Sequence, residues 1–317
     1  MSLWKIAWRS IQQRSLASAL TAFSMALGVA LVVTVLVVYQ VVSISFHRGG
    51  EGYDLIVGAK GSKEQLVLNT VYYLQQPVEN IPYSYYEEFT EGRFAPDVDA
   101  AIPVCMGHTY QGFRVVGTVP EMFENLTYLG GQKYEFAAGQ NFSATAPFEG
   151  VIGAAVARET NVRVGSTFQA VHGVAEEGGK AHQESFTVVG ILAPTGTPND
   201  RALFVNMEGF YHIHEHADTE HNDAVGDHEH EKQVTAVLVC VKETPPGRAE
   251  VMARVINQDK VAQAVAPARV IADLFEGIIG KLEWLLLFMA VLIVVVAGIG
   301  IMVSIYTSMS ERRHEIA

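Results

Sequence analysis

The residues with the clearest capacity for chemistry lie between positions 212 and 231, where histidine and acidic side chains alternate. This tract holds six of the chain's eleven histidines. Imidazole nitrogens are good ligands for Zn, Cu and Ni, and neighbouring carboxylates raise the local cation concentration and can complete a coordination shell. The predicted metal ligands are His212, His214, His216, His221, His228 and His230.

The spacing of these histidines matches no closed site such as His-Glu-x-x-His, so the sequence predicts a flexible loop whose geometry the metal would impose. Weak, exchangeable binding of Zn or another transition metal is expected, and no other cofactor. Two other interpretations stay open. The tract could be a solvated acidic insertion without a ligand, or a pH sensor, because an unperturbed histidine titrates near pH ~6.5.

The remaining residues give no indication of catalysis. The stretch from Gly58 to Lys63 contains two glycines, but a phosphate-binding Walker A loop needs four residues between its glycines and then Lys-Ser/Thr, so a glycine turn is the better interpretation. His108, His172 and His182 are scattered and are expected to be structural or exposed. No Ser/His/Asp order, Cys/His pair or carboxylate pair stands in a recognisable context. We therefore expect a non-enzymatic chain without catalytic or cofactor-binding residues.

Charge is distributed unevenly along the 317 residues. Residues 1–43 carry three basic side chains and no acid, residues 44–280 carry 16 basic and 31 acidic side chains, and residues 281–317 carry three of each. Because phosphate neutralisation needs clustered Lys and Arg, the acidic central region argues against nucleic-acid binding. Cys105 and Cys240 each lie in a strand-like run and are expected to be buried free thiols, while a disulfide in an oxidising compartment stays open.

Two long apolar runs are expected to form transmembrane helices. Residues 17–43 and 282–309 each exceed the roughly 20 residues that cross a hydrocarbon core of about 30 Å, and in lipid the backbone must satisfy its own hydrogen bonds. The first run is too long for the apolar region of a signal peptide, so it is expected to remain uncleaved. Ala22, Ala26 and Ala30 recur every fourth residue and are expected to pack against a neighbouring helix.

The ends of the chain suggest an orientation. Residues 1–16 are expected to form an amphipathic helix at the membrane interface, with Trp4 and Trp8 on its apolar face. The basic N-terminal cluster, together with Arg312 and Arg313, places both termini in the cytoplasm by the positive-inside rule. Residues 44–280 would then lie on the other side, which is the periplasm in a bacterium.

Between the apolar runs the sequence predicts a large α+β extracytoplasmic domain at residues 44–246. Short Val-rich runs bounded by Gly, Pro, Asn or Asp predict strands, and longer periodic runs predict helices. The predicted strands are 54–62, 65–74, 100–107, 112–120, 150–158, 185–194, 201–206 and 234–242, and the predicted helices are 83–91, 119–126 and 153–160. Apolar residues at helix-like spacing predict a stalk helix at 247–281.

Several of these stretches give the chain a resemblance to a known family. A membrane helix that runs directly into Glu311-Arg312-Arg313-His-Glu315-Ile-Ala, at residues 310–317, resembles the second helix and coupling segment of the MacB/FtsX/LolC class of ABC transporter permeases. Residues 54–69, 112–118, 151–157 and 188–201 are similar to the periplasmic core domain of MacB-like permeases. The family normally continues with two more membrane helices, so the chain is expected to be truncated after the second.

The resemblance implies a multi-pass permease subunit in the bacterial inner membrane. A separate ATPase would contact Glu311, Arg312, Arg313 and Glu315, and its ATP-driven motion would reach the periplasmic domain, for export or extraction of a lipoprotein, peptide or drug or for a metal-linked process. The implied partners are the ATPase, a second permease subunit in a homodimer or heterodimer, membrane lipid and a periplasmic protein. A two-span sensor with a metal- or pH-sensing periplasmic domain is the alternative, and the charged tail could also be a solvated helix end.

Overall fold

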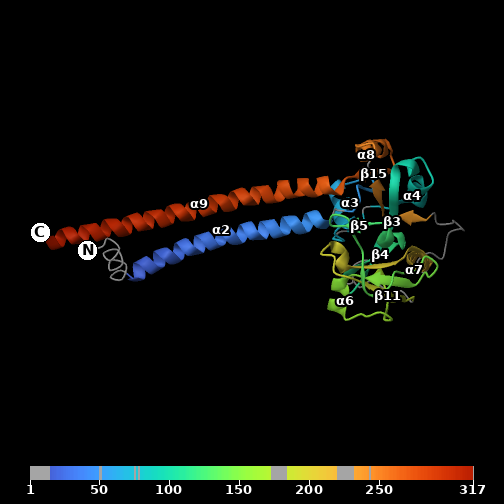
Figure 1. The fold of residues 1–317 in the computed structure, drawn as a ribbon, viewed down its shortest axis with the longest axis horizontal. Helices are drawn as coiled ribbons and strands as arrows, with labels where there is room; N and C mark the ends of the chain where they lie inside the picture. Colours follow the sequence, from blue (N-terminus) through green and yellow to red (C-terminus); the bar gives the residue numbers. More distant parts are fainter. Residues whose placement is uncertain are drawn as a thin grey trace. The chain divides into compact units, whose positions relative to one another are not determined.

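The computed structural model describes residues 15–49, 52–74, 76–77, 79–172, 184–219, 232–242 and 244–316 of the chain (Figure 1). The chain divides into two compact units. Unit 1 consists of Met1–Ile44 and Leu274–Ala317, and unit 2 is Ser45–Asp273.

Unit 1 is built from two long helices, α2 (Ser15–Gly49) and the unit 1 part of α9 (Pro267–Ile316). They approach closely at Gly28, where an added Cβ would lie 2.5 Å from Cγ2 of Ile293. Both runs predicted to span a membrane are therefore helical. Among the helices in the described part of the chain, none is found to be both long and apolar enough to cross a membrane. Residues 1–14 lie outside the described residues, so the interfacial helix stays a prediction.

Unit 2 is organised around a mixed sheet of eleven strands (Figure 1). Its main path runs β15-β1-β14-β3-β4-β12-β8-β11-β7, with β10 paired to β3 and β9 paired to β11. Two pairs, β11 with β8 and β12 with β4, are parallel, and the other pairs are antiparallel. The small pairs β13-β2 and β5-β6 lie outside this sheet.

The strands have the following bounds: β1 Leu55–Ala59, β2 Ile81–Pro82, β3 Val98–Tyr110, β4 Phe113–Thr118, β5 Thr127–Tyr128, β6 Gln132–Lys133, β7 Phe136–Gly139, β8 Glu149–Ile152, β9 Thr167–Phe168, β10 Val171–His172, β11 Phe186–Leu192, β12 Ala202–Asn206, β13 Gln233–Val234, β14 Ala236–Val241 and β15 Ala262–Val265. The helices of this unit are α3 Lys63–Thr70, α4 Tyr83–Thr90, α5 Glu121–Glu124, α6 Ala154–Thr160, α7 Met207–Thr219 and α8 Arg248–Gln258, with short 3-10 turns at Ala95–Asp97 and Pro198–Arg201.

The central strands are buried on both faces. All residues of β1, β4 and β12 are buried, and so are five of the six residues of β14. Runs of Val, Ile and Leu without polar alternation are typical of strands covered on both sides. Helix α7 lies close to β4, because a side chain at Gly117 would collide with the ring of Phe210. The predicted α+β class is confirmed, as are the predicted helices near 83–91, 119–126 and 153–160.

Residues 65–74 were predicted to form a strand, and this is wrong. They begin inside α3, whose N-cap is Ser62: its side chain accepts a hydrogen bond from the backbone N–H of Gln65 at 3.1 Å. A Ser followed three residues later by Gln is the sequence signature of a capping box. The apolar residues Leu66 and Val67 are buried on the inner face of this helix.

The predicted stalk at 247–281 is also wrong over its first part. Residues 248–258 form α8, which packs on the sheet, and residues 262–265 form the edge strand β15. The long helix α9 begins only at Pro267, where proline is favoured at the first helical position. The core unit therefore extends to Asp273 and not to residue 246.

Candidate functional site

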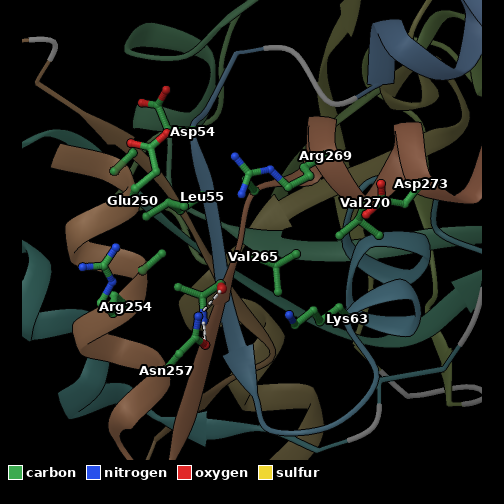
Figure 2. Close-up of a pocket in the computed structure, with 14 residues that line it drawn as sticks. Asp54, Leu55, Lys63, Glu250, Arg254, Asn257, Val265, Arg269, Val270 and Asp273 are labelled. Atoms are coloured by element: carbon green, nitrogen blue, oxygen red, sulfur yellow. Dashed lines mark hydrogen bonds between the residues drawn. The ribbon is translucent and has the colours of Figure 1, made fainter. Parts of the chain in front are cut away.

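A groove of about 530 Å³ lies in unit 2 beside the edge strand β15 (Figure 2). Its walls come from α8, the start of β1, β15 and the first turns of α9, with Lys63 of α3 at one side. A volume of this size falls within the range of roughly 300–1,000 Å³ that is typical of ligand pockets.

The groove is lined mainly by apolar residues and by charged residues. The apolar lining is Leu55, Ala249, Ala253, Ala264, Val265, Ala266 and Val270. The charged lining is Asp54, Lys63, Glu250, Arg254, Arg269 and Asp273, and all six are exposed. The groove therefore offers an apolar surface with three cations and three anions around it, which suits a polar or peptide-like partner better than a purely apolar one.

The helical spacing of residues in α8 places three of its polar side chains at the groove. Met252 and Ile256 are buried against the sheet and fix the inner face of the helix. Glu250, Arg254 and Asn257 follow one another at spacings of four and three residues, so they share another face. Figure 2 shows these three side chains on the same helix beside β15.

Asn257 closes the free edge of β15. Its amide nitrogen donates to the carbonyl of Ala264 at 3.0 Å, and its amide oxygen accepts from the N–H of Ala264 at 3.0 Å. One side-chain amide thus takes the place of the next strand on the unpaired side of Ala264. Because open strand edges are templates for pairing with other chains, this contact protects the edge of the sheet.

The predicted metal-binding tract is only partly within the described residues. His212, His214 and His216 lie in α7, while His221, His228 and His230 lie outside the described residues. The expectation of a flexible loop is therefore wrong for the first three histidines. His212 is exposed, and its ring lies 6.1 Å from that of Phe148 between centres.

Two histidines that seemed scattered in the sequence are neighbours in the fold. His108 on β3 is fully buried, and its ring centre lies 5.1 Å from that of His172 on β10 and 4.9 Å from that of Phe210 on α7. His172 is exposed. His182 lies outside the described residues. The pair follows from the antiparallel register, in which the two residues stand opposite each other.

The predicted helix-packing and coupling residues fall in unit 1. Ala22, Ala26 and Ala30 are exposed, and among the side chains of α2 that the structure describes the buried position is Gly28, so these three alanines do not form the contact with α9 within this chain. Packing of the stripe against another subunit stays a prediction. The backbone of Glu311, Arg312, Arg313 and Glu315 continues α9, and their side chains are not described.

In the comparisons with known proteins, a family model matches most of unit 2 and part of unit 1. Residues 18–269 match the family described as the MacB-like periplasmic core domain. The chain belongs to this family. It is also similar to the solved extracellular domain of the noncanonic ABC-type transporter YknZ from Gram-positive bacteria, at 12% identity and a TM-score of 0.34, over 67% of this chain and 98% of that one. No curated protein matches.

The MacB-like stretch at 188–201 ends in a tightly hydrogen-bonded loop. One carboxylate oxygen of Asp200 accepts from the N–H and the hydroxyl of Thr195, both at 2.8 Å, and the other accepts from the N–H of Gly196 at 2.9 Å. The loop presents Asn199, whose side chain accepts from the hydroxyl of Tyr73 and donates to that of Tyr134, both at 2.7 Å. This loop therefore connects segments of the MacB-like domain that are distant in the sequence.

The two cysteines of the domain are free thiols, as expected from the sequence. Cys240 stands opposite Ala100 on β3. Ala100 is five residues from Cys105 on the same strand, so a rise of about 3.3 Å per residue separates the two cysteines by roughly 16 Å. A disulfide needs Cα atoms within about 7 Å, so this fold cannot join them. Burial raises the pKa of Cys105 to about 12 and that of Cys240 to about 11.

Sequence reasoning missed the groove residues altogether. Arg254, Asn257 and Arg269 were assigned to a stalk, since the short strand β15 carries only four residues and no strong strand pattern. Pro267, which follows α8 and β15 in the sequence, marked a break that could have separated α8 from α9.

Proposed function

We propose that this chain is a permease subunit of a MacB-like ABC transporter that transmits the motion of a separate ATPase to its periplasmic domain. The observation that carries the proposal is the family match over residues 18–269, which covers most of the chain. The name of the matched family supports placing unit 2 outside the cytoplasm, and in this proposal the charged tail would contact the ATPase.

Helix α9 provides the physical link in this proposal. It runs without a break for 50 residues, from Pro267 at the sheet edge to Ile316 in the charged tail. Arg269, Val270 and Asp273 of its first turns also line the groove. A displacement of the tail by an ATPase would therefore act on a helix whose first residues form a wall of the candidate binding site.

The membrane arrangement belongs to the same proposal. Residues 17–43 and 282–309 would cross the inner membrane, both termini would lie in the cytoplasm, and the acidic unit 2 would lie in the periplasm. Within α2 and α9, many apolar side chains such as Phe23, Leu27, Phe288 and Val294 are exposed, which suits contact with lipid. A second permease subunit, as a homodimer or heterodimer, would complete the transporter.

The substrate class is proposed from both the family and the sequence. A lipoprotein, peptide or drug fits the family, and the histidine tract, which begins on α7, adds a metal-linked process. A two-span sensor of metal or protons is the second candidate, because the same tract could bind Zn²⁺ without any transport. The neighbouring reading frames would distinguish the two, since an ATPase with a Walker motif is required only by the transporter.

The coupling tail can be tested directly. Reversing both Arg312 and Arg313 to Glu should weaken co-purification of the chain with its ATPase at least tenfold, because the interface would lose two attractive charges. Lys281→Glu is the matched control, since it reverses a charge at the other end of the predicted membrane span. Undiminished association of the double reversal variant would count against the coupling role.

A further inference from the structure

A small cavity of about 20 Å³ lies within unit 2, separate from the groove beside β15, with which it shares no lining residue. Its lining includes Thr70, the last residue of α3, and Asn199 from the loop that Asp200 organises. Most of its lining residues carry a hydroxyl or an amide group, and the others, such as Met122 and Leu126, are apolar. A cavity this small and this polar has room only for a very small polar molecule.

The hydroxyl of Thr70 is a buried polar group whose hydrogen bonding is incomplete. Thr70 is itself buried, and its Oγ1 atom has no hydrogen-bond partner in the part of the chain that the structure describes. A buried hydroxyl without a partner destabilises a fold, because folding removes it from water without supplying a replacement bond. Since Thr70 also lines the cavity, a small molecule bound there can supply that bond.

Three tyrosines line the same cavity, namely Tyr53, Tyr73 and Tyr134. The hydroxyl of Tyr73 donates to the side chain of Asn199 at 2.7 Å, so its oxygen can still accept a hydrogen bond. The hydroxyl of Tyr134 accepts from the same side chain at 2.7 Å, so it can still donate. Burial raises the pKa of Tyr53 well above its usual value, and the neighbouring Tyr134 raises it further, so Tyr53 keeps its proton at neutral pH. The cavity therefore offers both donors and acceptors.

We propose that this cavity binds one ordered water molecule, which bridges the hydroxyl of Thr70 to the tyrosine hydroxyls. A buried water needs roughly 10–15 Å³ of space and two to four polar partners, and the cavity meets both conditions. Tyr53 follows the end of α2 by four residues, Thr70 ends α3, and Asn199 lies in the 3-10 turn after β11. The water therefore completes a hydrogen-bond network that joins three segments far apart in the sequence.

Thr70→Val tests this proposal, because valine keeps the shape of the side chain and removes only the hydroxyl. If the hydroxyl binds the water, the variant loses that bond and its unfolding equilibrium constant should rise at least fivefold. If the cavity is dry, the variant removes an unsatisfied group and the constant should stay the same or fall. Urea unfolding of the full chain in detergent measures it. Thr90→Val is the matched control, since Thr90 also ends an eight-residue helix but is exposed, and it should change the constant less than twofold.

A crystal structure of the full chain at high resolution tests the water directly, even if the valine variant fails to fold. Electron density should show a peak in the cavity roughly 2.5–3.0 Å from Oγ1 of Thr70, the usual separation for a hydroxyl hydrogen bond. Density without such a peak, or an unfolding constant that Thr70→Val leaves unchanged or lowers, would overturn the proposal. Neither measurement involves an ATPase or a substrate, so both results are independent of the proposed transporter function.

Discussion

Asn257 shows how one side chain can decide whether a sheet edge is open. Asn257→Ala would remove both hydrogen bonds to Ala264 and should lower the free energy of unfolding by about 1–2 kcal/mol. Urea unfolding of the purified chain measures the change. Gln258→Ala, at the neighbouring exposed position of α8, is the control and should change stability by less than about 0.5 kcal/mol. Equal effects of the two substitutions would show that the edge contact contributes nothing.

Asp200 organises the loop at the end of the MacB-like stretch. Asp200→Ala would leave the N–H groups of Thr195 and Gly196 without their acceptor and should cost about 2–4 kcal/mol of unfolding free energy. Asp200→Asn keeps one carbonyl oxygen as an acceptor, so its loss should be smaller. An Asn variant as unstable as the Ala variant would mean that the negative charge, and not the hydrogen-bond geometry, holds the loop.

Burial of Cys105 should make the stability of the fold decrease as the pH rises above the ordinary thiol pKa. Burial raises its pKa to about 12, so the folded chain keeps the thiol proton at a pH where the unfolded chain loses it. Its contribution to stability is complete below the ordinary thiol pKa of about 8.5 and is lost as the pH rises toward 12. Cys105→Ala should therefore make the alkaline decline of stability less steep, as measured by urea unfolding from pH 8 to 11.

Alkylation checks the same thiol independently. Cys105 is only 3% exposed, whereas Cys240 is partly exposed, so iodoacetamide should modify Cys240 first in the native chain. Mass spectrometry of the digested protein distinguishes the two sites. Faster modification of Cys105 would contradict its burial beside Tyr211, whose hydroxyl oxygen lies 3.6 Å from the Cys105 sulfur.

At the scale of elements, the sequence predicted those whose pattern is local. The Val-rich strands β4, β11, β12 and β14 are evident from composition, and α4 to α6 follow from short periodic runs. Helix α3 was missed because its β-branched residues favour a strand, although Ser62 and Gln65 carry the capping signal. Helix α7 was missed because its histidines and acids resemble a solvated loop, whereas Phe210 and Ile213 of this helix are buried in the core.

The groove could not be predicted from local sequence patterns. It depends on β15 pairing with β1 across about 200 residues of sequence, and a four-residue strand gives no local sign of such a partner. Once that pairing is known, the positions of Glu250 and Arg254 follow from the period of α8 alone. Tertiary contact, and not propensity, therefore creates the candidate site.

The contact between α2 and α9 gives a prediction at this scale. Gly28→Leu would place side-chain atoms where Cγ2 of Ile293 lies and should separate the two helices locally. Hydrogen exchange of the α9 backbone around Ile293 should increase at least tenfold. Ala26→Leu, at an exposed position of the same helix, is the control and should leave the exchange rate unchanged.

For the whole molecule, the sequence predicted the α+β domain and its family, and the match over residues 18–269 confirms both. Its domain boundary was too early because the chain returns to the sheet through α8 and β15 before α9 begins. That return is important for the proposed mechanism. It joins the first turn of α9 to the edge of the sheet, where a displaced helix would act on the domain.

The most direct test of the account is the side of the membrane on which each part lies. Single cysteines at Glu121, an exposed residue of unit 2, and at Ala317 are introduced into a chain that carries Cys105→Ala and Cys240→Ala. A maleimide that cannot cross the inner membrane should label position 121 in intact cells and position 317 only after that membrane is broken. Labelling of both positions under the same condition would contradict the proposed permease.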